Sequence, residues 1–166
     1  ILQLGYPGGP LIDDLARQGN DQAINFPLSL LEKDSLDFSF SGIKTSVLYY
    51  VNGKQGRERD ASALSPKQKA DVAASFQRAA ATMLMEKLRR AAARYPAKSI
   101  MVGGGVSANS VIRHRLQILG AELGLPVFIP PLRFCTDNAA MTAGLGYPLL
   151  KAGKVAGLDL EAIATV

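Results

Sequence analysis

The feature that most constrains the fold is a change of pattern after Pro96, where short apolar runs begin to alternate with helical segments. The sequence predicts a strand at Ser99–Val102, a helix at Ser107–Leu123, a strand at Pro126–Ile129 and a helix at Asp137–Leu150. This order is typical of parallel α/β sheets, because parallel strands need a long crossover connection. We therefore expect an α/β unit here.

A long helix is predicted before this unit. Ser65 is the expected N-cap, Pro66 suits the first helical position, and Gln68 completes a capping box. Apolar residues then recur every three or four positions, as on a face packed against a core: Val72, Phe76, Ala80, Met83, Leu84, Leu88 and Ala91. Basic residues gather in the last turns, where the helix dipole favours cations: Lys87, Arg89, Arg90 and Arg94. Pro96 prevents the helix from continuing.

The N-terminal part of the chain is less regular. A glycine- and proline-rich turn at Leu4–Pro10 leads into a predicted short helix, Leu11–Gln18. Asp37–Phe40 alternates polar and aromatic residues, which indicates a short strand, and Ile43–Val51 is a predicted helix. The charged segment Asn52–Leu64 is interpreted as a surface loop.

Composition narrows the class of protein. A chain of 166 residues with 48% hydrophobic residues suits one folded domain. Its single cysteine excludes a disulfide framework, and it shows neither a secretory signal nor an apolar run long enough for a membrane helix. We expect a cytoplasmic protein. The net charge of +5 permits a polyanionic partner such as RNA, without requiring one. Because the chain starts at Ile1 and its first methionine is Met83, we also expect it to be part of something longer.

Two loops follow the predicted strands, where ligands bind in open α/β sheets. The first, Gly103–Asn109, combines glycines that allow close approach of a backbone with an asparagine that can donate and accept hydrogen bonds. The helix N-terminus that follows offers unpaired N–H groups to a ligand. The loop matches neither the Walker nor the dinucleotide-binding pattern. A tight turn with Ser107 or Asn109 as N-cap is the structural alternative.

The second loop, Phe134–Asn138, contains Asp137, which is either a helix N-cap or a carboxylate ligand for a metal. One aspartate cannot hold a catalytic metal alone, so further ligands would be needed. His114 is interpreted as a surface or packing residue within a helix, and Cys135 as a small buried residue.

Four segments, taken together, carry a resemblance to a known family. They are LGYPGGPLIDDLA at residues 4–16, DFSFSGIKT at 37–45, VGGGVSAN at 102–109 and CTDNAAMTA at 135–143. In this order and spacing they resemble the C-terminal part of the tRNA N6-adenosine threonylcarbamoyltransferase family (TsaD, Gcp or YgjD), formerly called O-sialoglycoprotein endopeptidase. The resemblance extends to about Leu150.

The resemblance implies an α/β protein with the actin-like ATPase (ASKHA) fold, in which two lobes enclose a nucleotide cleft. The chain would be most of the C-terminal lobe, helix-rich with a short and incomplete sheet, and the N-terminal lobe would be absent. Within residues 1–166, residues 1–64 would hold the turn, short helix, strand and surface loop. Residues 65–150 would hold the long helix and the parallel α/β part, and residues 151–166 a tail.

The implied activity is an acyl transfer. Family members move the threonylcarbamoyl group of threonylcarbamoyl-AMP to N6 of the tRNA adenosine next to the anticodon, and they use one iron or zinc ion. Bacterial members work with a paralogous TsaB-like protein and a small TsaE-like ATPase. The His-x-x-x-His motif that supplies two metal ligands is not in this sequence, so we expect the chain alone to be inactive and to hold metal poorly.

Site residues follow from the matching positions. Gly9 matches a position that contacts the adenylate, Asp13 a position that contacts its ribose, and Asn109 a substrate-binding asparagine. Asp137 matches a metal ligand, and Lys44 stays unassigned because a structural role fits it equally well. We expect Gly9, Asp13, Asn109 and the glycine turn to converge on one concave surface, with Asp137 near Asn109 at the edge of the cleft.

Two other classes of function compete with this one. A nucleotide-binding ATPase or sugar-kinase-like domain would use the same glycine turn and Asn109 for ATP. A non-catalytic scaffold would keep only a surface for partner proteins. Peptidase activity has no support, because the sequence has neither HExxH nor a catalytic dyad or triad.

Overall fold

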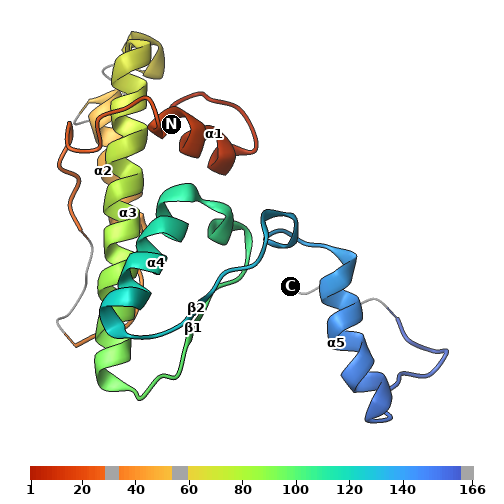
Figure 1. Ribbon diagram of the computed structural model, residues 1–166. Helices are drawn as coiled ribbons and strands as arrows, with labels where there is room; N and C mark the ends of the chain where they lie inside the picture. Colours follow the sequence, from red (N-terminus) through yellow and green to blue (C-terminus); the bar gives the residue numbers. More distant parts are fainter. Residues whose placement is uncertain (29–33, 54–59, 162–166) are drawn as a thin grey trace.

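The computed structural model describes residues 1–28, 34–53 and 60–161, and helices dominate it (Figure 1). The helices are α1 (Gly8–Ala16), α2 (Ser41–Asn52), α3 (Pro66–Arg94), α4 (Ser110–Leu123) and α5 (Ala139–Lys151). The strands are β1 (Ile100–Met101) and β2 (Val127–Phe128), and three short 3-10 turns are η1 (Ala61–Ala63), η2 (Gly105–Ala108) and η3 (Leu132–Phe134). The order of elements after α3 confirms the predicted alternation of strand and helix.

Helix α3 is the central element, with 29 residues and therefore a length of about 43 Å at 1.5 Å per residue. Its N-terminus has the predicted capping box. The Ser65 hydroxyl accepts a hydrogen bond from the Gln68 N–H at 3.2 Å, and the Gln68 side chain accepts from the Ser65 N–H at 2.8 Å. Pro66 occupies the first turn, and the helix ends at Arg94, before Pro96.

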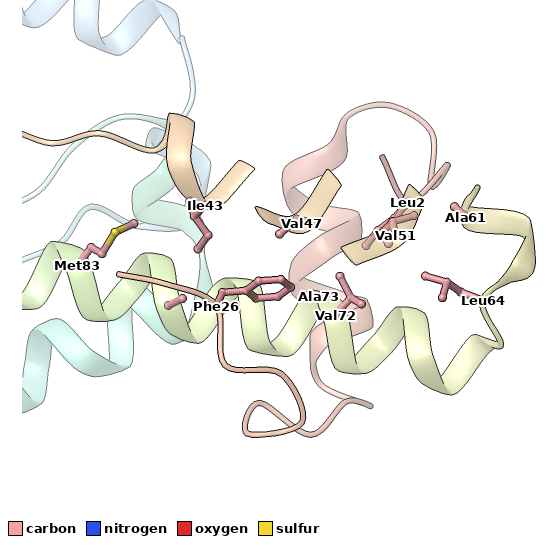
Figure 2. Close-up of a cluster of buried hydrophobic side chains, with 11 residues drawn as sticks. Leu2, Phe26, Ile43, Val47, Val51, Ala61, Leu64, Val72, Ala73 and Met83 are labelled. Carbon is pink, nitrogen blue, oxygen red and sulfur yellow. The ribbon is translucent and has the colours of Figure 1, made fainter. Parts of the chain in front are cut away.

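The N-terminal half of α3 packs against α1 and α2 around the first of two hydrophobic clusters (Figure 2). Its buried members are Leu2, Phe26, Ile43, Val47, Val51, Ala61, Leu64, Val72, Ala73, Ala79 and Met83. Small residues on α3 leave room for close neighbours, and Gly19 shows how close: a Cβ there would overlap the backbone of Ala70. This packing fixes α1 against the middle of α3.

The second cluster lies where the C-terminal half of α3 meets α4 and the sheet. Ala81, Ile100, Ile112 and Leu116 form its buried centre. Strands β1 and β2 pair in parallel, and α4 is the crossover between them. Helix α4 covers one face of this sheet. Met101 and Phe128, which pair across the strands, are 79% and 56% exposed, so the other face is open.

Helix α5 lies apart from the rest of the chain (Figure 1) and buries none of its residues. Its exposed apolar side chains are Met141, Leu145, Tyr147, Leu149 and Leu150. A helix this apolar normally packs against a partner surface. No helix in the described part of the chain has both the length and the apolar character needed to cross a membrane.

Several predicted elements differ from the structure in type or in bounds. Asp37–Phe40 forms no strand, because no described segment pairs with it, although Phe38 and Phe40 stack with ring centroids 6.3 Å apart. The short helix predicted at Leu11–Gln18 begins earlier, at Gly8, and the helix predicted from Ser107 begins as the 3-10 turn η2. Part of the predicted surface loop, residues 54–59, lies outside the described residues.

Lys87 also differs from the other basic residues near the end of α3. Its side chain is only 2% exposed, and its ammonium group donates a hydrogen bond to the Ser35 backbone oxygen. A buried ammonium needs such an acceptor, since leaving water without one is costly. The hydrogen bond of Lys87 therefore connects the segment before α2 to α3.

Candidate functional site

Asp13 is the centre of a hydrogen-bond network that joins α1, α3 and the start of α4. Its Oδ1 atom accepts from Gln77 Nε2 at 3.0 Å and from Asn109 Nδ2 at 3.2 Å. The Ser110 hydroxyl donates to the same oxygen at 2.7 Å, and the Ser110 N–H lies 3.3 Å from Oδ1 and 3.2 Å from Oδ2. The predicted convergence of Asp13 and Asn109 is confirmed, because the two side chains are in direct contact.

Both the nitrogen and the oxygen of the Asn109 side-chain amide form hydrogen bonds. Its Nδ2 donates to Gln77 Oε1 at 3.1 Å as well as to Asp13, and its Oδ1 accepts from the Ile112 N–H at 3.0 Å. Asn109 is therefore the N-cap of α4, as the structural alternative predicted. Ser107 has another role, since its hydroxyl donates to the Gly104 oxygen at 2.6 Å.

Asp13 itself occupies the N-terminus of α4. The sequence led us to expect unpaired N–H groups for a ligand at this helix end, but the Ser110 N–H donates to Asp13 and the Ile112 N–H to Asn109. A carboxylate suits this place, because the helix dipole is positive here. The expectation was wrong for these two N–H groups: they hold the protein's own side chains.

The network leaves two acceptor positions. Oδ1 of Asp13 already accepts from three side chains, whereas Oδ2 accepts from the Ser110 N–H and lies 3.5 Å from the Arg17 guanidinium. The Asp13 side chain is 12% exposed, so a small part of it reaches solvent. On Asn109, Oδ1 has one bonded donor and two lone pairs. A ligand bound here would meet these two acceptor oxygens beside the exposed Arg17 guanidinium.

Exposed glycines precede both Asp13 and Asn109 in the sequence. Gly9 is in the first turn of α1, four residues and so about 6 Å along the axis from Asp13. A Cβ at Gly9, Gly103 or Gly105 would meet no atom within 4 Å, and only Gly104, with φ of +81°, needs glycine for its backbone conformation. Within the described chain, neither crowding nor backbone conformation requires glycine at the other three positions.

Asp137 is exposed and does not cap α5. Asn138 is the N-cap, and its Oδ1 accepts from the Met141 N–H at 3.2 Å. The N-cap interpretation of Asp137 was therefore wrong, because the helix begins at Ala139 and its N-cap is the residue after Asp137. Whether Asp137 lies near Asn109 stays a prediction.

The described residues do not form a complete metal site. Among them, no three His, Cys, Asp or Glu side chains lie together in a way that could hold an ion. Asp137 can supply one carboxylate ligand, but catalytic zinc sites use about three protein ligands. His114 is exposed on α4, as predicted, and Cys135 is buried, with its sulfur 3.5 Å from the Pro131 oxygen.

A cavity of about 590 Å³ lies between the N-terminal segment, α1, α2 and α3. Most of the residues that line it are apolar, and the polar side chains among them are those of Gln3, Ser41 and Lys44. Gly8 lines it, but Asp13 and Asn109 do not. The cavity is thus separate from the hydrogen-bond network.

Sequence reasoning missed Gln77 and Ser110. Gln77 offered one signal, since it is a polar residue within an alanine-rich helical stretch, where a buried amide must find partners. Ser110 offered none, because its role depends on the packing of α1 against α4.

Comparison with known proteins decides the family. The family model of TsaD, described as tRNA N6-adenosine threonylcarbamoyltransferase, matches residues 1–144. This chain belongs to the TsaD family. The resemblance seen in the four sequence segments is therefore confirmed, and the observed α/β arrangement agrees with it.

Curated relatives support the same assignment, and each is named tRNA N6-adenosine threonylcarbamoyltransferase. The protein of Moorella thermoacetica is 47% identical over 98% of this chain and 46% of the relative. The protein of Thermosipho africanus is 46% identical over 98% of this chain and 47% of the relative. The protein of Clostridioides difficile is 44% identical over 98% of this chain and 46% of the relative. The chain spans about half the length of the curated relatives it matches.

Proposed function

We propose that this chain forms part of the adenylate-binding surface of a tRNA N6-adenosine threonylcarbamoyltransferase. The observation that carries the proposal is the 3.2 Å hydrogen bond between Asn109 and Asp13. The family resemblance assigned these residues separately to one substrate, and they lie in different elements, far apart in sequence. Their direct contact supports a shared site.

The free acceptor positions suit a ribose. A sugar diol offers two neighbouring hydroxyl donors, and Asp13 Oδ2 and Asn109 Oδ1 are the acceptors that the network leaves available. In this proposal Asp13 binds ribose through Oδ2, while Oδ1 holds the site together. The carboxylate then has a binding role and a structural role at the same time.

The open glycines suit close approach of the adenylate. Gly9, Gly103 and Gly105 leave open space around their backbone within the described chain, so a ligand can approach there without meeting a side chain. The ribose or phosphate of the adenylate would use this space in van der Waals contact. The same argument gives Gly9 its role in contacting the adenylate.

The reaction in the proposal is an acyl transfer from threonylcarbamoyl-AMP to tRNA. A bond forms between N6 of the adenosine and the carbamoyl carbon, the bond from that carbon to the phosphate oxygen breaks, and AMP leaves. N6 loses one proton, which passes to the departing phosphate or to solvent water. The residues of this chain bind and orient the nucleotide part, which stays bound while the acyl group moves.

The remaining parts of the proposal concern the complete protein. It would have the ASKHA fold, with this chain in the C-terminal lobe, and Asp137 as one ligand of an iron or zinc ion whose other ligands lie outside these residues. It would act in the cytoplasm with a TsaB-like paralogue and a TsaE-like ATPase. The exposed apolar side chains of α5 are consistent with further protein packing there.

An ATPase or kinase-like function is the second candidate, because acceptors matched to ribose would serve ATP as well as an adenylate. The two are separated by measuring, in the complete protein carrying these residues, whether threonylcarbamoyl transfer to tRNA or ATP hydrolysis depends on Asp13 and Asn109. Loss of transfer alone supports the transferase.

Gly9→Ala and Gly103→Ala test the site without disturbing the fold. Both positions have space for a methyl group, and alanine raises helix propensity at Gly9, so stability should stay the same or increase by up to about 1 kcal/mol. The KM for threonylcarbamoyl-AMP should rise. Gly146→Ala, in α5, is the matched control. Unchanged KM values in both variants would contradict the proposal.

A further inference from the structure

We infer that Gln77 is a positioning residue that sets the orientation of Asp13 and Asn109 toward the substrate, an inference that rests on the proposed function. Gln77 lies near the middle of α3, and it is 5% exposed. It therefore has little surface with which to touch a ligand. Its contacts are with the two residues proposed to do so.

The three side chains form a closed set of hydrogen bonds. Gln77 donates to Asp13 at 3.0 Å, Asn109 donates to Asp13 at 3.2 Å, and Asn109 donates to Gln77 at 3.1 Å. Each residue belongs to a different element: α1, α3 and the N-cap of α4. These hydrogen bonds therefore hold Asp13 and Asn109, the two residues proposed to bind substrate, in a fixed position relative to the buried Gln77.

The chemistry of the amide explains why glutamine suits this place. The position requires a donor toward the Asp13 carboxylate and an acceptor toward the Asn109 amide, and the glutamine side chain ends in one of each. A carboxylate would face Asp13 with like charge. An apolar residue would leave Asn109 without an acceptor and Asp13 with one donor fewer, and unpaired buried groups are costly.

The bond from Asn109 to Gln77 also determines which way the Asn109 amide faces. With both Nδ2 hydrogens bonded to Asp13 and Gln77, the Asn109 oxygen is directed toward the Ile112 N–H and the free acceptor side. Without Gln77, one hydrogen loses its acceptor, and the amide is less well fixed. Substrate affinity should then fall, although no substrate contact has been removed.

Gln77→Glu provides the sharpest test, because the new carboxyl can replace glutamine only while it is protonated. In that form it donates to Asp13 and accepts from Asn109, as the amide does. The neighbouring Asp13 carboxylate and burial both raise the pKa of the new carboxyl, whereas Arg17, 3.5 Å from Asp13, acts in the opposite direction. The variant should therefore behave like the wild type at low pH and lose function as pH rises.

The measurement is the KM for threonylcarbamoyl-AMP and the kcat for tRNA modification across pH, in the complete protein carrying this chain. For Gln77→Glu we expect the ratio of its KM to the wild-type KM to rise roughly tenfold or more between the acidic and the basic end of the pH range. A change of this size is typical for the loss of a hydrogen bond to a charged group. Gln117→Glu, on the exposed side of α4, is the matched control and should show no such change. A purely structural role would lower the active fraction, and thus kcat, without this change in KM.

Gln77→Met keeps the length of the side chain and removes both hydrogen bonds, so it serves if the glutamate variant does not fold. Its KM should be raised at every pH, without the pH dependence. A wild-type KM in Gln77→Met, or a pH-independent KM in a folded Gln77→Glu protein, would overturn the inference. If Gly9→Ala and Asp13→Asn also leave KM unchanged, the proposed function itself has failed rather than the role of Gln77.

Discussion

The Asp13 carboxylate accepts hydrogen bonds from both the backbone N–H and the hydroxyl of Ser110, a residue 97 positions later in the chain. This pair joins α1 directly to the first residue of α4. A carboxylate at the start of a helix is stabilised by the helix dipole and by the N–H groups that the helix itself cannot pair. Asp13 therefore contributes to the fold as well as to the candidate site, and mutations there should affect both.

The first prediction concerns the stability contributed by this carboxylate. Asp13→Asn places an NH₂ group where the carboxylate faces donors from Gln77, Asn109 and Ser110, so at least one bond is lost. We expect the free energy of unfolding to fall by about 1–3 kcal/mol. Urea denaturation followed by circular dichroism would measure the change.

Asp14→Asn is the control for this change, since Asp14 lies next in α1 and is exposed. Among the described residues, its one polar side-chain contact is a 3.7 Å ion pair with Arg17. It should change stability by less than about 1 kcal/mol. Equal effects of the two substitutions would show that the Asp13 network adds nothing beyond surface charge.

The second prediction concerns the packing of α4 on the sheet. A Cβ at Gly120 would overlap the Val127 side chain and lie 2.9 Å from the Leu125 oxygen, so Gly120→Ala should destabilise the protein by about 1–3 kcal/mol. Gly144→Ala, in exposed α5, meets no atom and should be neutral or stabilising by up to about 1 kcal/mol. Thermal unfolding of both variants tests the pair, and a stable Gly120→Ala protein would contradict the observed packing.

The third prediction is a pH dependence at the start of α3. The Asn20 backbone N–H, 2.7 Å from Asp71, and the Lys67 ammonium, at 2.6 Å, lower the pKa of Asp71 below its ordinary value of 3.8. Because the pKa is lower in the folded state, the contribution to stability is complete above about pH 4 and is lost as pH falls through the folded-state pKa. Acid titration of unfolding free energy should show a shallower loss for Asp71→Asn.

Lys67→Met removes only the second of these two causes. It should therefore reduce the acid sensitivity in part, between wild type and Asp71→Asn. Identical acid profiles for all three proteins would exclude Asp71 as a contributor.

The fourth prediction separates two neighbouring residues before α5. Asn138→Ala removes the N-cap bond to the Met141 N–H and should cost the helix about 1 kcal/mol, visible as reduced helical circular dichroism. Asp137→Asn should leave helicity unchanged, because Asp137 does not cap the helix. In the complete protein, we expect Asp137→Asn to reduce bound metal and Asn138→Ala to retain it. Metal analysis that shows the reverse would refute the assignment of Asp137.

Local signals in the sequence predicted much of the fold. The capping box at Ser65 and Gln68 defined the start of α3, and the alternation after Pro96 defined the parallel pair with its crossover helix. These features depend on neighbours a few residues away. The strand predicted at Asp37–Phe40 was wrong for a non-local reason, since a strand requires a partner that no local pattern reveals.

The site was predictable only in part. The resemblance identified Asp13 and Asn109, but not that they bond to each other, because their contact depends on how α1 packs on α3 and α4. The same packing brings in Gln77, which has no motif of its own. The cap of α5 was misplaced by one residue, since Asp137 and Asn138 both suit an N-cap and the sequence does not separate them.

The length of α3 has a mechanical consequence for the candidate site. One unbroken helix contributes buried side chains to both hydrophobic clusters, and Gln77 lies in the part of it that packs in the first cluster. The two clusters cannot move relative to each other unless α3 bends or breaks. The separation of α1 and the start of α4 along α3 is therefore fixed. A ligand that binds at Asp13 and Asn109 would therefore meet two residues that one helix holds in place through Gln77.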